Sequence, residues 1–170
     1  GATFRYNKEE CFYGVEAANG LKGTYMLLDQ ASVTGTANIL MAAVLAEGTT
    51  TIYNAACEPY LQQLCKMLVS MGAKINGIGS NLLTVEGVSS LRGCQHRILP
   101  DMIEIGSWIG LAAMTRSEIT IKNVSWENLG LIPETFRKLG ISLEKVGDDI
   151  YIPRQETYEI QGYIDGSILT

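Results

Sequence analysis

The sequence is poor in residues that hold metals and in the basic residues that bind nucleic acids. It contains one histidine and four cysteines among 170 residues, and no two cysteines form a CxxC pair. This composition argues against a zinc site, and we expect no metal or other cofactor. Lysine and arginine total 13 against 18 acidic residues, for a formal charge of -5. Non-specific binding of nucleic acid requires clustered positive charge, so no nucleic-acid partner is expected.

The sequence also lacks the segments that direct a chain into or across a membrane. No uninterrupted apolar run reaches the roughly 18 residues of a membrane helix. The N-terminus does not show the charged-then-apolar layout of a signal peptide. Reduced thiols are typical of cytoplasmic proteins, so we expect a cytoplasmic protein without a membrane partner. With 46% hydrophobic residues, the chain can bury a sizeable core.

The main organisational feature is an internal repeat. A predicted strand ends at Asn54 and another at Asn123, 69 residues later. An amphipathic helix is followed by Gly72 in the first copy and by Gly140 in the second, 68 residues later. Glycine at these positions is a typical left-handed helix stop. We therefore interpret the chain as two copies of one βαβαββ unit, a mixed α/β (α+β) fold.

Hydrophobic periodicity predicts the elements of each copy. In the first copy, strands are expected at 24–28, 50–54, 74–78 and 82–86, and helices at 36–46 and 59–71. In the second copy, strands are expected at 95–99, 119–123, 142–146 and 150–153, and helices at 101–114 and 129–139. The first helix of each copy is apolar on most faces, which predicts that it is enclosed. Residues 1–4 resemble the start of a further hairpin, and 158–164 a further strand.

The two copies differ most at the turn that precedes their first helix. In the first copy this turn carries the hydroxyls of Ser32, Thr34 and Thr36 with a glycine. A helix N-terminus presents unpaired N–H groups and a positive dipole end, where an anion such as phosphate can bind. A hydroxyl that only caps the helix is the alternative interpretation. The second copy has Asp101 and Glu104 there, so only the first copy is suited to an anion.

Other polar residues admit simpler explanations. Glu58 is predicted at a helix N-terminus on the same edge as the hydroxyl turn, as a charge–dipole contact or a site carboxylate. Asp101 and Glu104 could be paired acids or ordinary first-turn carboxylates. His96 has no second histidine or clear acid–base partner, and we interpret it as a polar strand residue. Cys57 and Cys65 are interpreted as packing residues.

Several segments in the same order resemble the enolpyruvyl transferases, in particular those that act on UDP-N-acetylglucosamine. The matching segments are 29–36, 45–50, 54–59, 71–75, 85–88 and 99–104. The resemblance implies an inside-out α/β barrel, with buried helices, sheets outside, and two domains of three βαβαββ units each. Residues 1–98 would supply the end of one unit and a complete unit of the first domain. Residues 99–170 would supply one unit of the second domain and a following strand.

The resemblance also implies an activity. Members transfer the enolpyruvyl group of phosphoenolpyruvate to the 3-hydroxyl of UDP-N-acetylglucosamine, the first committed step of peptidoglycan synthesis, without a metal. The substrate-binding residues implied for the nucleotide sugar are Gln30, Ala31, Ser32, Val33 and Thr34. Glu58 and Asp101 match acidic positions that border the cleft between domains. No catalytic residue of the family falls in these 170 residues, so this central part is expected to be inactive alone.

The sequence departs from the family pattern at three positions. Gln30, Cys57 and Met102 stand where members often have a lysine, an arginine and an arginine, so we expect one or more anion contacts to be weaker or supplied elsewhere. The alternatives are a 5-enolpyruvylshikimate-3-phosphate synthase and a non-catalytic module of βαβαββ repeats. Helix faces left open by missing neighbouring units also predict self-association of the 170-residue chain.

Overall fold

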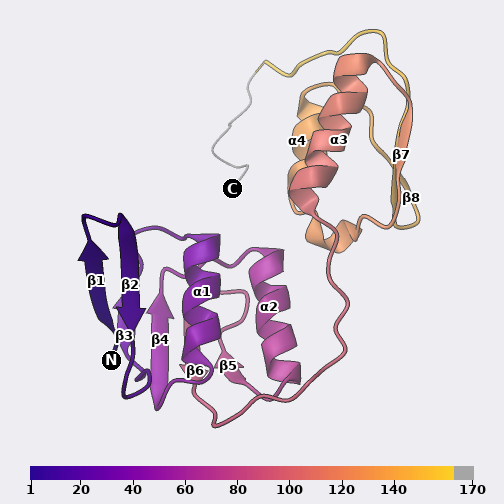
Figure 1. The fold of residues 1–170 in the computed structure, drawn as a ribbon. Coiled ribbons are helices and arrows are strands. Elements are labelled where there is room, and N and C mark those ends of the chain that lie inside the picture. Colours follow the sequence, from indigo (N-terminus) through magenta and orange to yellow (C-terminus); the bar gives the residue numbers. More distant parts are fainter. Residues whose placement is uncertain (163–170) are drawn as a thin grey trace. The chain divides into compact units, whose positions relative to one another are not determined.

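The computed structural model describes residues 1–162 and divides the chain into two compact units, Gly1–Ile98 and Leu99–Thr170. Each unit contains helices packed on one sheet, and the first unit also carries a separate hairpin (Figure 1).

The first unit contains a two-stranded hairpin and a four-stranded mixed sheet. The hairpin consists of β1 (Thr3–Asn7) and β2 (Phe12–Glu16). The sheet has the order β3-β4-β6-β5, from β3 (Tyr25–Leu27), β4 (Thr49–Tyr53), β5 (Lys74–Asn76) and β6 (Leu82–Glu86). These strands confirm the predicted ones to within a few residues, and β1 and β2 confirm the hairpin expected at the N-terminus.

Two helices connect the strands and cover one face of this sheet. Helix α1 (Val33–Ala43) joins β3 to β4, and α2 (Pro59–Ser70) joins β4 to β5. Strands β3 and β4 are parallel, with Tyr25 opposite Thr51, as expected for a strand–helix–strand connection. The carboxyl ends of both strands therefore lie at the same edge of the sheet.

The core of the first unit lies between these helices and the sheet. Leu40 of α1, Cys65 of α2, and Ile52 and Val85 of the sheet are each at most 1% exposed. The predicted apolar face of α2 is confirmed, because Leu61, Cys65 and Leu68 are buried. Helix α1 is covered on one face only within the described residues: Met41 is 48% exposed, and Leu45 in the turn that follows the helix is 55% exposed.

Two glycines allow the turn between α1 and β4 to be clamped from both sides. The amide of Gly23 donates to the Glu47 carbonyl at 2.7 Å, and the amide of Gly87 donates to the Gly48 carbonyl at 2.9 Å. A Cβ at position 87 would lie 1.6 Å from the carbonyl oxygen of Ala46, and a Cβ at position 23 would lie 2.3 Å from that of Thr49. Only glycine permits this close backbone approach.

The second unit has a three-stranded sheet of order β7-β9-β8. Its strands are β7 (Ile119–Ile121), β8 (Glu144–Val146) and β9 (Asp149–Ile152). Its helices are α3 (Met102–Thr115), the short 3-10 helix η1 (Trp126–Asn128) and α4 (Ile132–Lys138). The buried face of α3 carries Ile105, Ile109 and Ala112, whereas Ile103 and Met114 are exposed.

Four predicted elements differ from the structure. The helix predicted at 36–46 is found at Val33–Ala43. Residues 95–99 do not form a strand, because they lie at the boundary between the two units rather than along an edge of either sheet. The helix predicted at 129–139 begins only at Ile132, because Gly130 adopts a left-handed φ of +54°. The strand predicted at 158–164 is absent from 158–162, and its last two residues lie outside the described residues.

The helices of residues 1–162 were compared with what a bilayer requires. None is both long enough and apolar enough to cross one.

We expect Gly87→Ala to destabilise the first unit by a few kcal/mol, because the added methyl would overlap the Ala46 carbonyl. The matched control is Gly93→Ala, since a Cβ at position 93 meets no atom within 4 Å. Urea unfolding followed by circular dichroism measures both. Equal stability of the two variants would contradict the proposed clamp.

Candidate functional site

The candidate site is built from two loops that leave the same edge of the first sheet. One loop follows β3 and leads into α1, and the other follows β4 and leads into α2. Asn54 links the two loops where they leave the strands, because its side-chain amide donates to the Leu28 carbonyl at 2.9 Å. Its backbone is left-handed, with a φ of +59°. Asparagine tolerates this conformation better than most residues. The predicted placement of both loops at one edge is therefore confirmed.

The hydroxyl turn forms the N-terminus of α1. Ser32 is the N-cap, with extended backbone, and its Oγ accepts a hydrogen bond from the Gly35 amide at 3.1 Å. The Thr34 hydroxyl lies 3.5 Å from that of Ser32, and both side chains are exposed. The helix begins three residues earlier than predicted because Ser32 supplies this cap. Ser32 therefore caps α1, and the N-terminus that it caps is exposed and lined by hydroxyls.

Thr36 connects the two loops. Its hydroxyl donates to the Ser32 carbonyl at 2.7 Å and accepts from the Ala56 amide at 3.0 Å. Thr36 is fully buried and Ala56 is 3% exposed, so water does not compete for either bond. A buried amide without an acceptor is costly, so the Thr36 hydroxyl fixes the second loop to the first.

The second loop ends in two polar side chains at the start of α2. Cys57 is exposed, and its carbonyl accepts from the Gln62 side chain at 2.9 Å. Glu58 is the N-cap of α2 without capping it through its side chain. Its Oε2 is buried and makes no hydrogen bond in the structure. Glu58 therefore lies on the same edge as the hydroxyl turn, as predicted.

The corresponding helix N-terminus in the second unit is closed by its own acids. The carboxylate of Asp101, the N-cap of α3, accepts from the amides of Ile103 at 2.8 Å and Glu104 at 3.2 Å. Glu104 adds a second negative charge in the first turn, whereas α1 has no acid there. An external anion would meet the carboxylates of Asp101 and Glu104 at the start of α3, whereas the N-cap and first turn of α1 carry no acid. The structure therefore shows the predicted contrast between a hydroxyl-capped helix in the first copy and an acid-capped helix in the second.

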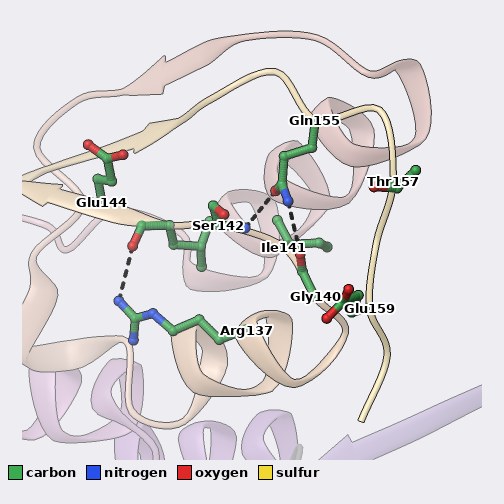
Figure 2. A pocket seen from close by; sticks show the side chains of 9 residues that line it. Arg137, Gly140, Ile141, Ser142, Glu144, Gln155, Thr157 and Glu159 are labelled. Atoms are coloured by element: carbon green, nitrogen blue, oxygen red, sulfur yellow. Dashed lines mark hydrogen bonds between the residues drawn. The ribbon is translucent and has the colours of Figure 1, made fainter.

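Sequence reasoning did not identify the most evident hollow of the second unit. This pocket of about 690 Å³ lies beside the turn between α4 and β8, and Arg137, Ser142, Gln155 and Glu159 are among its lining residues (Figure 2). The Gln155 side chain accepts from the Ser142 amide at 2.7 Å and donates to the Gly140 carbonyl at 3.1 Å. The Gln155 amide group thus holds the backbone of Gly140 and Ser142 in place. No motif in the sequence identifies this residue.

The remaining candidates do not form a reactive site. Burial raises the pKa of the Cys65 thiol, which keeps it protonated and agrees with its interpretation as a packing residue. Cys57 is exposed, so its interpretation as a packing residue is wrong. His96 is half-buried outside any strand, so its placement in a strand is wrong. Among residues 1–162, no group of three or more His, Cys, Asp or Glu side chains could hold a metal ion.

The fold is that of the enolpyruvyl transferases. The enolpyruvyl transferase NikO from Streptomyces tendae superposes with a TM-score of 0.77 at 18% identity, covering 91% of this chain and 40% of that one. An EPSP synthase from Acinetobacter baumannii superposes with a TM-score of 0.64 at 22% identity, covering 94% of this chain and 38% of that one. The expected fold class is confirmed.

The sequence profile of EPSP synthase (3-phosphoshikimate 1-carboxyvinyltransferase) matches residues 1–163, and the chain belongs to that family. A UDP-N-acetylglucosamine 1-carboxyvinyltransferase of Bacteroides thetaiotaomicron is 73% identical over the whole chain. The enzyme of that name from Porphyromonas gingivalis is 67% identical over the whole chain. The chain spans 39% of the length of each of these two relatives.

We expect Ser32→Ala to lower the free energy of unfolding by about 1 kcal/mol, because it removes the cap of α1. Ser32→Asp is the matched control, since aspartate caps helices as well as serine does. Thermal and urea unfolding of both variants measure the difference. A Ser32→Ala protein as stable as the wild type would show that the cap contributes nothing.

Proposed function

We propose that the chain is part of a UDP-N-acetylglucosamine 1-carboxyvinyltransferase. This enzyme transfers the enolpyruvyl group of phosphoenolpyruvate to the 3-hydroxyl of UDP-N-acetylglucosamine and releases phosphate, the first committed step of peptidoglycan synthesis. The observation that carries the proposal is 73% identity over all 170 residues to a relative of that name. Because the chain spans 39% of that relative, the activity is assigned to a longer protein and not to these residues alone.

In this proposal the hydroxyl turn binds the nucleotide sugar. The residues assigned to it are Gln30, Ala31, Ser32, Val33 and Thr34. Four of them are exposed, Val33 is half-buried, and together they lead into a helix N-terminus without an acidic first turn. A diphosphate placed there would be stabilised by the helix dipole and by hydroxyl donors. The neutral Gln30 contributes no charge, so the dipole carries more of this interaction.

We propose a location, but no catalytic role, for the acidic residues Glu58 and Asp101. We assign Glu58 and Asp101 to the borders of the cleft between the two domains of the longer enzyme. Asp101 already accepts two backbone hydrogen bonds, so it is committed to holding α3. Residues 1–98 would close the first domain, and residues 99–170 would begin the second. The proposed reaction requires no metal, and the proposed location is the cytoplasm.

A turnover assay tests the proposed function. The longer enzyme should release phosphate when given phosphoenolpyruvate and UDP-N-acetylglucosamine, and the isolated 170-residue chain should release none. Shikimate 3-phosphate replaces the nucleotide sugar in a parallel reaction and should not support release. Turnover with shikimate 3-phosphate alone would establish the other enzyme of this fold, and turnover by the isolated chain would overturn the division proposed here.

The Ser32→Asp variant separates ligand binding from helix capping. Aspartate keeps the cap but places a carboxylate where the diphosphate would lie, which copies the arrangement at Asp101. In the longer enzyme we expect UDP-N-acetylglucosamine to bind about tenfold or more weakly, with stability unchanged. Calorimetric titration measures the affinity. Unchanged affinity in a stable variant would remove the turn from the binding site.

We also propose that the isolated chain self-associates through its uncovered helix faces. Ile103 of α3 is 66% exposed and Met114 is 87% exposed, and Met41 of α1 and Leu45 in the turn after α1 are also exposed. Apolar patches of this kind mark contact surfaces. Light scattering should report a mass above that of one chain, and Met114→Lys should lower it. A strict monomer at all concentrations would contradict the proposal.

A further inference from the structure

The Thr36 hydroxyl links the two loops of the candidate site, and the Asn54 side chain links them where they leave β3 and β4. The Thr36 hydroxyl donates to the carbonyl of Ser32, the cap residue of α1, and it accepts from the amide of Ala56. Ala56 is followed directly by Cys57 and Glu58, at the start of α2. This buried hydroxyl thus holds the loop that follows β3 against the loop that follows β4.

The second copy shows that the fold does not need this bridge. The repeat places Asp101 at the position of Ser32, so Ile105 occupies the position of Thr36 and Ser125 that of Ala56. Ile105 is buried and offers no hydrogen-bonding group. The loop after β7 is held by the turn before β9 instead, where Asp149 accepts from the Asn123 amide at 2.8 Å and Asp148 from the Trp126 amide at 3.1 Å.

The bridge therefore occurs in the copy whose helix N-terminus is open to an anion, and not in the copy whose N-terminus is closed by acids. In the second copy the same scaffold packs well with the apolar Ile105 at the position that corresponds to Thr36.

We propose that Thr36 is a positioning residue for the nucleotide-sugar site. It holds the hydroxyl turn and the Cys57–Glu58 segment as one body, so that a ligand bound on the turn lies at a fixed distance from the start of α2. This inference rests on the function proposed above for the ligand. The bridge itself rests on the two hydrogen bonds alone.

The test compares three variants of the longer enzyme. Thr36→Val removes the hydroxyl and keeps the shape, and Thr36→Ser keeps the hydroxyl. The control is Thr50→Val, because Thr50 is also buried, at 3% exposure, but lies near the opposite end of β4. Two readouts are needed: the affinity for UDP-N-acetylglucosamine by calorimetry, and hydrogen exchange of the Ala56 amide by NMR.

We expect Thr36→Val to bind UDP-N-acetylglucosamine about tenfold more weakly and to exchange the Ala56 amide about tenfold faster. Thr36→Ser should restore both values to within about twofold of the wild type, and Thr50→Val should leave both unchanged. Equal weakening in Thr50→Val would show a general loss of stability and overturn the positioning role. Unchanged affinity in Thr36→Val would overturn it as well.

The two proposals fail in distinguishable ways. Absence of UDP-N-acetylglucosamine binding by the wild-type enzyme would overturn the proposed function, and with it the ligand assigned to this site. Unchanged Ala56 exchange in Thr36→Val would overturn the bridge, whichever ligand binds.

Discussion

The parallel pairing of β3 with β4 is the constraint on which the candidate site depends. It sends the carboxyl ends of both strands to one edge, so the loops that lead into α1 and α2 emerge side by side. The Asn54 side chain links the ends of β3 and β4, and the Thr36 hydroxyl links the two loops that follow them. The clamp at Gly23 and Gly87 fixes the opposite end of α1. Helix α1 is thereby held at both ends.

The two repeats share one scaffold but differ in charge at the N-terminus of their first helix. In both, a side chain at the N-cap accepts backbone amides at the start of the first helix. A serine leaves the positive end of the dipole open to an outside charge, whereas an aspartate followed by a glutamate fills it. The loop after β7 is likewise acidic: hydrogen bonds from its own backbone amide and from Ser125 hold the pKa of the Glu127 carboxyl below its ordinary value. The first turns of α3 and η1 therefore both carry a carboxylate.

Most of the fold could be predicted from the sequence because the signals are local. Alternating and helical periodicity marked the strands and helices, and the left-handed stops at Gly72 and Gly140 were predicted and found. The exceptions have local causes too: Gly130 delays α4, and residues 95–99 lie at the boundary between the units, where no strand partner is available. The hydroxyl turn was predicted as a site because its residue types differ between the copies.

The sequence by itself determined the repeat, the fold class and the contrast between Ser32 and Asp101, since each depends on residue type and spacing. The tertiary structure alone decided what Thr36 does, because its partner Ala56 is 20 residues away and is reached only after β4 pairs beside β3. It also decided that Glu58 Oε2 is buried without a partner, and that Gln155 holds the turn at Gly140. Such contacts arise from the packing of distant segments, which periodicity and composition do not record.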